Sequence, residues 1–204
     1  MLILILKNLL KMSELKKYKM FIDGEWVDSE SKKTFKSLNP ENNEPWVEVP
    51  EASEKDIDIA VNAAQKAFEG SWPNLFPRER AKYLKAIANE LRENAELLGK
   101  IETIDTGKLF KETKTQANYI AEYYDYYAGL ADKVEGTVLP IDKANMQVIT
   151  TRVPIGVVAA IIPWNSQMLL TAVKLAPALA MGNTVVIKSS ELAPATLFEF
   201  GKLI

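Results

Sequence analysis

Hydrophobic residues change their period twice in the last quarter of the chain, and this pattern predicts a strand, a helix and a second strand. The run Val157 to Ile162 is apolar and rich in β-branched residues, as in a strand buried on both faces. Pro163 ends this strand because proline has no amide hydrogen to donate. Apolar residues then recur at helical spacing from Met168 to Leu179, and Gly182 ends the helix before another apolar run. The order is that of a βαβ unit.

The two predicted strands are expected to lie parallel, because a helical crossover joins them. Their C-terminal ends then share one edge of the sheet, and ligands of open α/β sheets bind at that edge. Trp164 and Asn165 follow the first strand, while Lys188 and Glu191 lie at the end of the second. The polar residues of this unit are therefore predicted to converge where a nucleotide would bind.

The rest of the chain predicts short strands, four helices and one hairpin. Alternating apolar residues between Phe21 and Pro50 favour two or three short strands. The helices are expected after Ser53, after Pro77, from Leu98 to Gly107 and from Phe110 to Ala131. On the first of them, Ile57, Ala60, Val61, Ala64, Ala67 and Phe68 share one apolar face. Residues 136–154 predict a hairpin around a polar turn.

Composition indicates an ordinary globular protein. The 204 residues are 48% hydrophobic and 25% charged, which is enough apolar material for a core. The 25 basic and 27 acidic residues give a net charge of −2, so no nucleic-acid partner is expected. The sequence contains neither Cys nor His, which excludes a disulfide framework and an ordinary zinc site, and no metal ligands are predicted.

The apolar start MLILILKNLL is too short to span a membrane, because a spanning helix needs about 20 apolar residues and Lys7 and Asn8 interrupt the run. It also lacks the pattern of a secretory signal. We therefore expect residues 1–19 to be a disordered extension. Residues 1–11 of it are expected to be an upstream addition from a misassigned start codon. We expect no membrane partner, and a cytoplasmic location.

The two strand ends closely resemble a motif pair of the NAD(P)-dependent aldehyde dehydrogenases. The family has Pro-Trp-Asn after one strand, and after the next a Lys followed three residues later by Glu. Here these residues are Pro163, Trp164 and Asn165, and then Lys188 and Glu191. The run LAPALAMGNTVV between them and the upstream segments FIDGEWVDS, LNP and ETIDTGK are also similar to the family. The resemblance covers nearly everything from about residue 20 onward.

The resemblance implies an α/β fold with an incomplete parallel sheet. Residues 20–204 would form the N-terminal part of the family's cofactor-binding domain, with N-terminal helices and a hairpin at residues 136–154 that serves as an oligomerisation arm. The family's nucleophilic cysteine and its general-base glutamate, within a Glu-Leu-Gly-Gly segment, lie downstream of this sequence. We therefore expect the catalytic domain to be absent, the chain alone to be inactive, and the full-length protein to be a homo-oligomer.

The resemblance also assigns roles to single residues. Asn165 is implied to donate to the aldehyde oxygen as negative charge develops on it, and Lys174 to serve in proton relay and cofactor contact. The implied cofactor-binding residues are Ile161, Ile162, Pro163, Trp164, Lys188, Ser189, Ser190 and Glu191. NAD+ is expected to be preferred, because an acidic Glu191 would accept hydrogen bonds from ribose hydroxyls and repel a 2′-phosphate. NADP+ stays possible because Lys188 could compensate that phosphate.

Each assignment has a simpler structural alternative. Asn165 could cap the following helix, Lys188 could be a surface lysine, and Lys174 could extend its ammonium group to solvent. One departure from the family concerns the substrate. Many members continue with Phe-Pro after the Asn, whereas this chain has Ser166 and Gln167. The smaller, polar Ser166 predicts a wider or more polar substrate entrance.

The leading interpretation is the N-terminal part of an oxidoreductase that oxidises an aldehyde to a carboxylic acid with NAD(P)+. Two alternatives remain open. One is a non-catalytic nucleotide-binding or assembly module, and the other is an inactive truncated product.

Overall fold

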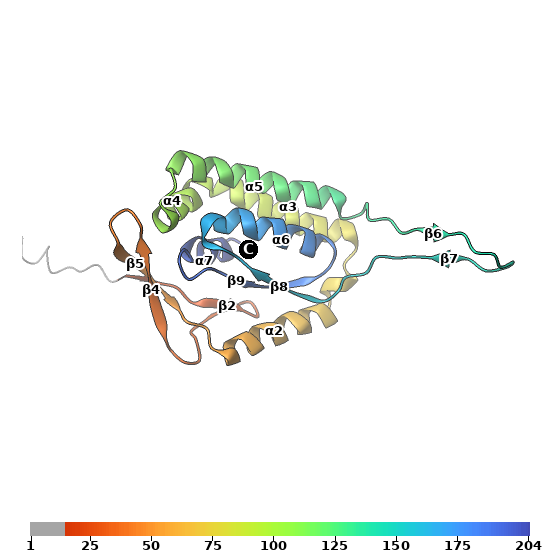
Figure 1. Cartoon of the computed structure of the whole chain (residues 1–204), viewed down its shortest axis with the longest axis horizontal. Coiled ribbons are helices and arrows are strands. Elements are labelled where there is room, and N and C mark those ends of the chain that lie inside the picture. The colour runs from red at the N-terminus through yellow and green to blue at the C-terminus, as the bar shows by residue number, and fades with distance from the viewer. Residues whose placement is uncertain (1–14) are drawn as a thin grey trace, which may run out of the picture.

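The computed structural model describes residues 15–204, which form a mixed α/β body with one projecting arm (Figure 1). The predicted upstream extension at residues 1–11 lies outside the described residues. A parallel pair of strands lies between a helical layer and a single helix. Further short strands flank this body on the side opposite the arm (Figure 1).

The predicted βαβ unit is present. Strand β8 (Val157–Ile161) leads through a short 3-10 turn, η2 (Trp164–Ser166), into helix α6 (Gln167–Ala180) and then strand β9 (Thr184–Lys188). The two strands pair in parallel, as predicted. Helix α6 contacts the pair from one side and helix α2 (Glu54–Glu69) from the other (Figure 1). A parallel pair is stable in this position because both of its faces are covered.

Asn183 fixes how the strands begin. Its Oδ1 atom accepts hydrogen bonds from the backbone amides of Ile155 at 2.8 Å and Gly156 at 3.1 Å. Its Nδ2 atom donates to the Ala178 carbonyl at 3.2 Å. Gly182, with φ of +85°, supplies the left-handed turn that brings Asn183 back toward the sheet. One buried side chain thus joins the end of α6 to the start of β8.

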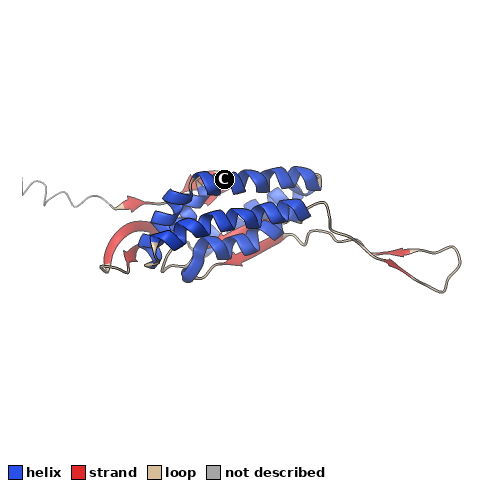
Figure 2. Ribbon diagram, turned by 90° about the horizontal axis from the view of Figure 1, so that it is seen from above, coloured by secondary structure: helices blue, strands red, loops and turns tan. Residues whose placement is uncertain are grey.

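Helices α3 (Pro77–Glu93) and α5 (Phe110–Leu130) pack with α6 into the helical layer (Figure 2). Apolar side chains from all three helices meet in the main core. Its members include Leu84, Ile87, Ala88, Leu91, Ala117, Ile120, Ala121, Tyr124, Met168, Ala172, Leu175 and Ala176. Burying one leucine of this set contributes roughly 1.5–3 kcal/mol.

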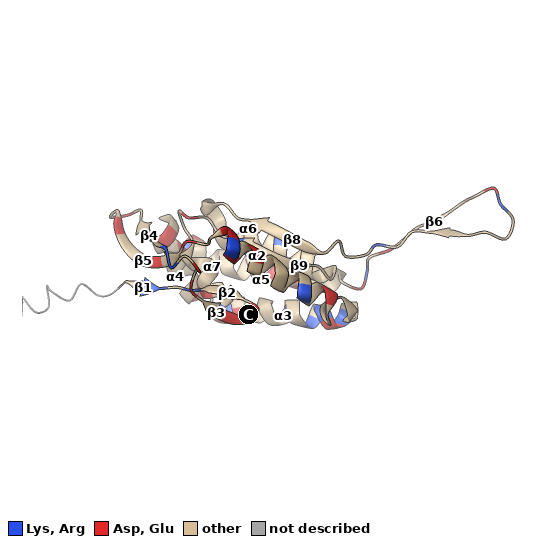
Figure 3. Ribbon diagram, turned by 90° about the horizontal axis from the view of Figure 1, so that it is seen from below, with Lys and Arg blue, Asp and Glu red and all other residues tan. Residues whose placement is uncertain are grey.

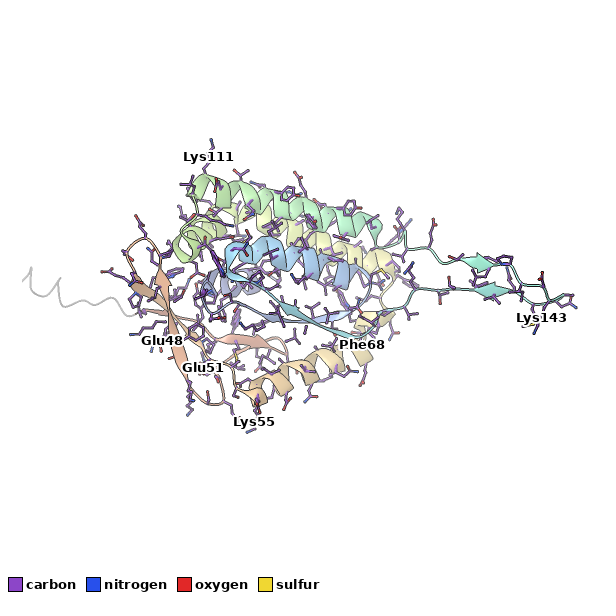
Figure 4. All side chains as sticks on the ribbon, in the orientation of Figure 1. Glu48, Glu51, Lys55, Phe68, Lys111 and Lys143 are labelled. Atoms are coloured by element: carbon purple, nitrogen blue, oxygen red, sulfur yellow. The ribbon has the colours of Figure 1, made fainter. Side chains whose placement is uncertain are left out.

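Helix α2 covers the other face of the parallel pair with only part of its predicted apolar face. Its capping box, formed by Ser53 and Asp56, is present. The ring of Phe68 lies next to Gly156 at the start of β8 (Figure 4). Ile57 and Val61, in contrast, are 53% and 40% exposed. Asp56, Ala60 and Phe68 are buried or half-buried, so Ile57 and Val61 lie at the exposed edge of the predicted apolar face.

The N-terminal strands form two small sheets. Strands β4 (Thr34–Asn39) and β5 (Glu44–Pro50) are antiparallel, and β1 (Lys16–Lys17) pairs in parallel with β5. Strands β2 (Met20–Ile22) and β3 (Glu25–Val27) form a separate hairpin.

The predicted disordered extension was too long. Tyr18 is 5% exposed and donates a hydrogen bond to Oε1 of Glu199, at 2.6 Å, on helix α7 (Ala195–Gly201). Lys16 pairs with the same carboxylate. Strand pairing and this contact order residues 16–19, whereas residues 1–14 lie outside the described part of the chain.

The predicted hairpin at residues 136–154 is confirmed. Strands β6 (Val138–Leu139) and β7 (Val148–Ile149) pair in antiparallel fashion in an arm that extends well away from the body (Figures 1 and 2). Lys143 lies at its tip (Figure 4). Val138 and Ile149 are 60% and 59% exposed within this chain. The role of the arm in oligomerisation stays a prediction.

A buried carboxylate on helix α4 (Ala95–Thr106) joins the flanking strands to the body. Asp105 is 2% exposed, and its Oδ1 atom accepts from Ser37 Oγ at 2.8 Å and Trp46 Nε1 at 3.2 Å. Its Oδ2 atom accepts from the Ala195 amide at 2.7 Å, at the start of α7. Burial raises the pKa of Asp105 to about 6. Four elements, β4, β5, α4 and α7, therefore meet at one side chain.

We expect Asp105→Ala to lower the free energy of unfolding by about 3 kcal/mol or more. The substitution leaves several donors without an acceptor, and each buried unpaired donor costs about 1–3 kcal/mol. Urea unfolding of the chain measures the change. Asp58→Ala, at an exposed position on α2, is the matched control and should change stability by less than about 0.5 kcal/mol. A loss as small as that of the control would contradict the role given to Asp105.

Candidate functional site

The predicted site residues collect at the C-terminal edge of the parallel pair. Ile161 of β8 is the register partner of Lys188 of β9. One residue later, the Ile162 amide donates to the Lys188 carbonyl at 3.0 Å. The segments 163–165 and 189–191 therefore leave the sheet from adjacent positions, as the sequence pattern predicted.

The segment after β8 presents most of its side chains to solvent. Trp164 is 52% exposed, Ile161 is 70% exposed, and Pro163 and Asn165 are also exposed. Ile162 differs, because its side chain is 2% exposed and belongs to the interior. A ligand at this edge could reach Ile162 only through its backbone.

The structure gives no support to the alternative in which Asn165 caps α6. The N-cap residue of α6 is Ser166, and no side chain forms a capping hydrogen bond there. The Asn165 amide lies exposed in η2, two residues before the first residue of α6. Its donor group is thus accessible to solvent at the end of β8.

Lys188 and Glu191 form an ion pair, with Nζ 3.0 Å from Oε2. Both side chains are largely exposed, at 61% and 66%. The backbone amide of Glu191 and the Lys188 ammonium lower the pKa of the Glu191 carboxyl. Glu191 is therefore an ionised acceptor at neutral pH. Between them, Ser190 is buried and its hydroxyl accepts from the Leu192 amide at 3.2 Å, which holds the turn. Ser189 is half-buried.

Lys174 lies on α6, half-buried, and its Nζ donates to the Leu170 carbonyl at 3.4 Å. Within residues 15–204 it makes no hydrogen bond or ion pair with the other predicted site residues. Lys174 and Lys188 are the only charged residues of β8, α6 and β9; charges of both signs gather instead on the surrounding elements (Figure 3). The structure therefore places the segments that carry Asn165, Lys188 and Glu191 at adjacent strand ends. Lys174 forms its hydrogen bond within α6 instead.

A second group lies beside η2, and sequence reasoning missed it. Lys108, in the connection between α4 and α5, donates a hydrogen bond to the Ser166 hydroxyl. The same ammonium lies 3.8 Å from Oε1 of Glu102, whose side chain is 2% exposed. This Oε1 atom has no hydrogen-bond partner within the described chain. The signal in the sequence was a glutamate on the inner face of a helix, in the segment ETIDTGK.

Burial is the main cause that raises the pKa of Glu102, to about 7. The nearby Asp105 charge acts in the same direction, and the Lys108 ammonium opposes both. A carboxyl that titrates near neutrality next to a candidate site is a feature that functional sites and buried ion pairs share.

No metal centre or membrane span accompanies these groups. Among residues 15–204, no cluster of three or more Asp or Glu side chains is arranged to hold a metal ion. None of the helices in the same range combines the length and the apolar character needed to cross a bilayer.

The family model described as the aldehyde dehydrogenase family matches residues 26–204. The chain belongs to the aldehyde dehydrogenase family. This confirms the resemblance that the two strand ends indicated. The chain is 49% identical over 191 residues to the (Z)-2-((N-methylformamido)methylene)-5-hydroxybutyrolactone dehydrogenase of Acinetobacter baylyi, covering 93% of this chain and 39% of that protein. It is 42% identical to the betaine aldehyde dehydrogenase of Bacillus subtilis, covering 91% and 38%.

Solved structures of aldehyde dehydrogenases share the fold. A point mutant of betaine aldehyde dehydrogenase from Staphylococcus aureus, solved in complex with NAD+, superposes with a TM-score of 0.88 at 38% identity. That match covers 91% of this chain and 38% of the other. The predicted α/β fold is thereby confirmed. The chain spans less than two-fifths of the length of these relatives.

We expect the free energy of unfolding of this chain to fall as pH rises toward neutrality. Between the ordinary Glu102 pKa of 4.5 and about 7, the native chain holds a proton that the unfolded chain releases. Stability therefore decreases across this window, by roughly 1–3 kcal/mol for one such group. Asp105, whose pKa is raised to about 6, adds to the decrease between its unfolded value and that pH.

Urea unfolding at pH 5 and pH 7.5 tests this expectation. Glu102→Gln should remove most of the difference between the two pH values, whereas Glu122→Gln, at an exposed position on α5, should leave it unchanged. An equal pH dependence in Glu102→Gln and the parent chain would show that Glu102 is not the titrating group.

Proposed function

We propose that this chain is the part of an aldehyde dehydrogenase that binds NAD(P)+ and polarises the aldehyde carbonyl. One observation carries the proposal: Asn165 and the Lys188–Glu191 pair leave neighbouring strands at one edge of the parallel sheet, in a member of this family. The overall reaction converts an aldehyde, water and NAD(P)+ into a carboxylic acid, NAD(P)H and a proton.

The proposed role of Asn165 is to stabilise charge on the aldehyde oxygen. When a thiolate attacks the carbonyl carbon, the oxygen takes up a negative charge. The Asn165 amide is exposed and does not cap α6, so it is available to donate a hydrogen bond to that oxygen. Such a donor acts mainly in the transition state, where the charge is largest.

The proposed role of Lys188 and Glu191 is to hold a ribose of the cofactor. Their chemistry fits: the ammonium can donate to a hydroxyl, and the ionised carboxylate can accept from one. The exposed faces of Pro163 and Trp164 would form an adjacent wall for the nicotinamide half. The bound cofactor would accept the hydride that leaves the aldehyde carbon. The ionised Glu191 is also the basis for proposing NAD+ as the preferred form.

Turnover requires a nucleophile that these 204 residues do not contain, because the sequence has no cysteine. The proposed function of the chain is therefore to bind and polarise, within an enzyme whose thiolate comes from other residues. The absence of cysteine equally favours the second candidate, a nucleotide-binding or assembly module without catalysis. The two candidates differ in whether an enzyme containing this chain produces NADH.

In an enzyme that contains this chain and a cysteine nucleophile, we expect Asn165→Ala to lower kcat by about 10²–10³, the usual effect of removing one oxyanion donor. The KM for NAD+ should stay nearly constant, because Asn165 faces the aldehyde. Steady-state NADH formation measures both values. The 204-residue chain alone should form no NADH in the same assay. An unchanged kcat would exclude Asn165 from the mechanism, and turnover by the chain alone would refute the requirement for cysteine.

We expect that enzyme to have a higher kcat/KM with NAD+ than with NADP+. Glu191→Gln should raise the relative efficiency of NADP+, because neutralising the carboxylate removes its repulsion of a 2′-phosphate. Glu122→Gln, which changes an exposed charge on α5, is the control for net charge and should leave the ratio unchanged. Preference of the parent for NADP+, or no shift of the ratio in Glu191→Gln, would defeat this explanation of cofactor choice.

A further inference from the structure

We propose that Lys108 is a positioning residue that holds Asn165 in place through the Ser166 hydroxyl. The inference rests on the proposed function of Asn165. It adds a group from the α4–α5 connection to a site otherwise built from the two strand ends.

The turn that carries Asn165 has few anchors of its own. Segment η2 is a single 3-10 turn, and Ser166 at its end forms no capping bond to α6. Pro163, Trp164 and Asn165 are all exposed, so packing holds them weakly. The hydrogen bond from Lys108 to the Ser166 hydroxyl joins this turn to a separate part of the fold. This link requires the Ser166 hydroxyl, because a hydrocarbon side chain at position 166 could not accept a hydrogen bond from Lys108.

Glu102 explains why the Lys108 ammonium stays at this position. The carboxylate is buried on α4, and Lys108 is its ion-pair partner at 3.8 Å. Glu102 is ionised above about pH 7. Its buried charge then needs such a partner, because leaving it unpaired costs several kcal/mol. Asp105, one turn further along α4, is the other charged group that acts on Glu102, and the Ser37, Trp46 and Ala195 donors already occupy it. Gly107, with φ of +76°, ends α4 in a left-handed turn immediately before Lys108.

The lysine side chain is itself confined. It is 29% exposed, whereas the side chains of Lys55 and Lys66 are 67% and 79% exposed. Gln167, which follows Ser166, is completely buried. The Ser166 hydroxyl thus bonds to a confined ammonium, and Ser166 lies in the chain between the buried Gln167 and the exposed Asn165.

The first test measures the mobility of η2 in the chain itself by ¹⁵N relaxation. Backbone order parameters at residues 164–167 should be near 0.85 in the parent and fall to about 0.6 in Lys108→Met. Ser166→Ala should have the same effect, and the double variant no further effect. Lys108→Arg should restore the parent values. The matched control is Lys111→Met, since Lys111 points away from the body at the outer end of α5 (Figure 4).

Equal order parameters in Lys108→Met and Lys111→Met would overturn the proposal. Should Lys108→Met fail to fold because Glu102 loses its partner, Ser166→Ala decides the question, because it keeps the ion pair and removes only the bond to η2. An unchanged η2 in Ser166→Ala would equally overturn it.

The second test separates positioning from a general structural effect. In an enzyme that contains this chain, Lys108→Met should lower kcat between about 10- and 100-fold, as small misplacements of reacting groups do, with the KM for NAD+ unchanged. In an Asn165→Ala background it should lower kcat no further. An equal loss in both backgrounds would show that Lys108 does not act through Asn165. A parent without NADH formation would refute the proposed function, and the order parameters would still decide whether Lys108 holds η2.

Discussion

The parallel pairing of β8 with β9 is the constraint on which the site depends. Because Ile161 and Lys188 are register partners, the two segments that follow them begin at neighbouring points on one edge. A shift by a single residue would turn every side chain of a strand to the opposite face. Asn183 opposes such a shift at the N-terminal end of β8, because its side chain accepts hydrogen bonds from the amides of Ile155 and Gly156. A side chain far from the sheet edge thereby sets the geometry of the candidate site.

The sequence was sufficient to predict this unit because its signals are local. Apolar runs, Pro163 and Gly182 mark strand and helix ends, and the crossover dictates a parallel pair. The prediction failed at residues 16–19, because the partner that orders Tyr18 is Glu199, at the opposite end of the chain. The apolar face of α2 was predicted from its period, but tertiary packing covers only part of that face and leaves Ile57 and Val61 exposed. The role of Lys108 and Glu102 was not predicted, because their contact with η2 joins segments that are distant in the sequence.

Helix α4 carries two buried carboxylates within one turn, and they act in different ways. Asp105 accepts hydrogen bonds from three other elements and organises the flanking strands. Glu102 instead retains an oxygen without a hydrogen bond and depends on one lysine. Burial raises the pKa of both groups, but only for Asp105 do several hydrogen-bond donors offset the cost of burying the charged carboxylate. Glu102, which has fewer hydrogen bonds than Asp105, is the carboxylate that Lys108 links to the turn bearing Asn165.

The strands of the projecting hairpin contain two residue pairs, Val138 with Ile149 and Leu139 with Val148, and Thr137 and Thr150 bond across it next to them. Val138, Leu139 and Ile149 are exposed within this chain. An isolated two-stranded ribbon is marginally stable in water. The arm therefore contributes little to the cohesion of the body, and the body imposes little on the arm. Substitutions in the arm should therefore leave the fold of the body intact. In evolutionary terms, substitutions in the arm and substitutions at the sheet edge that carries the site can accumulate independently of each other.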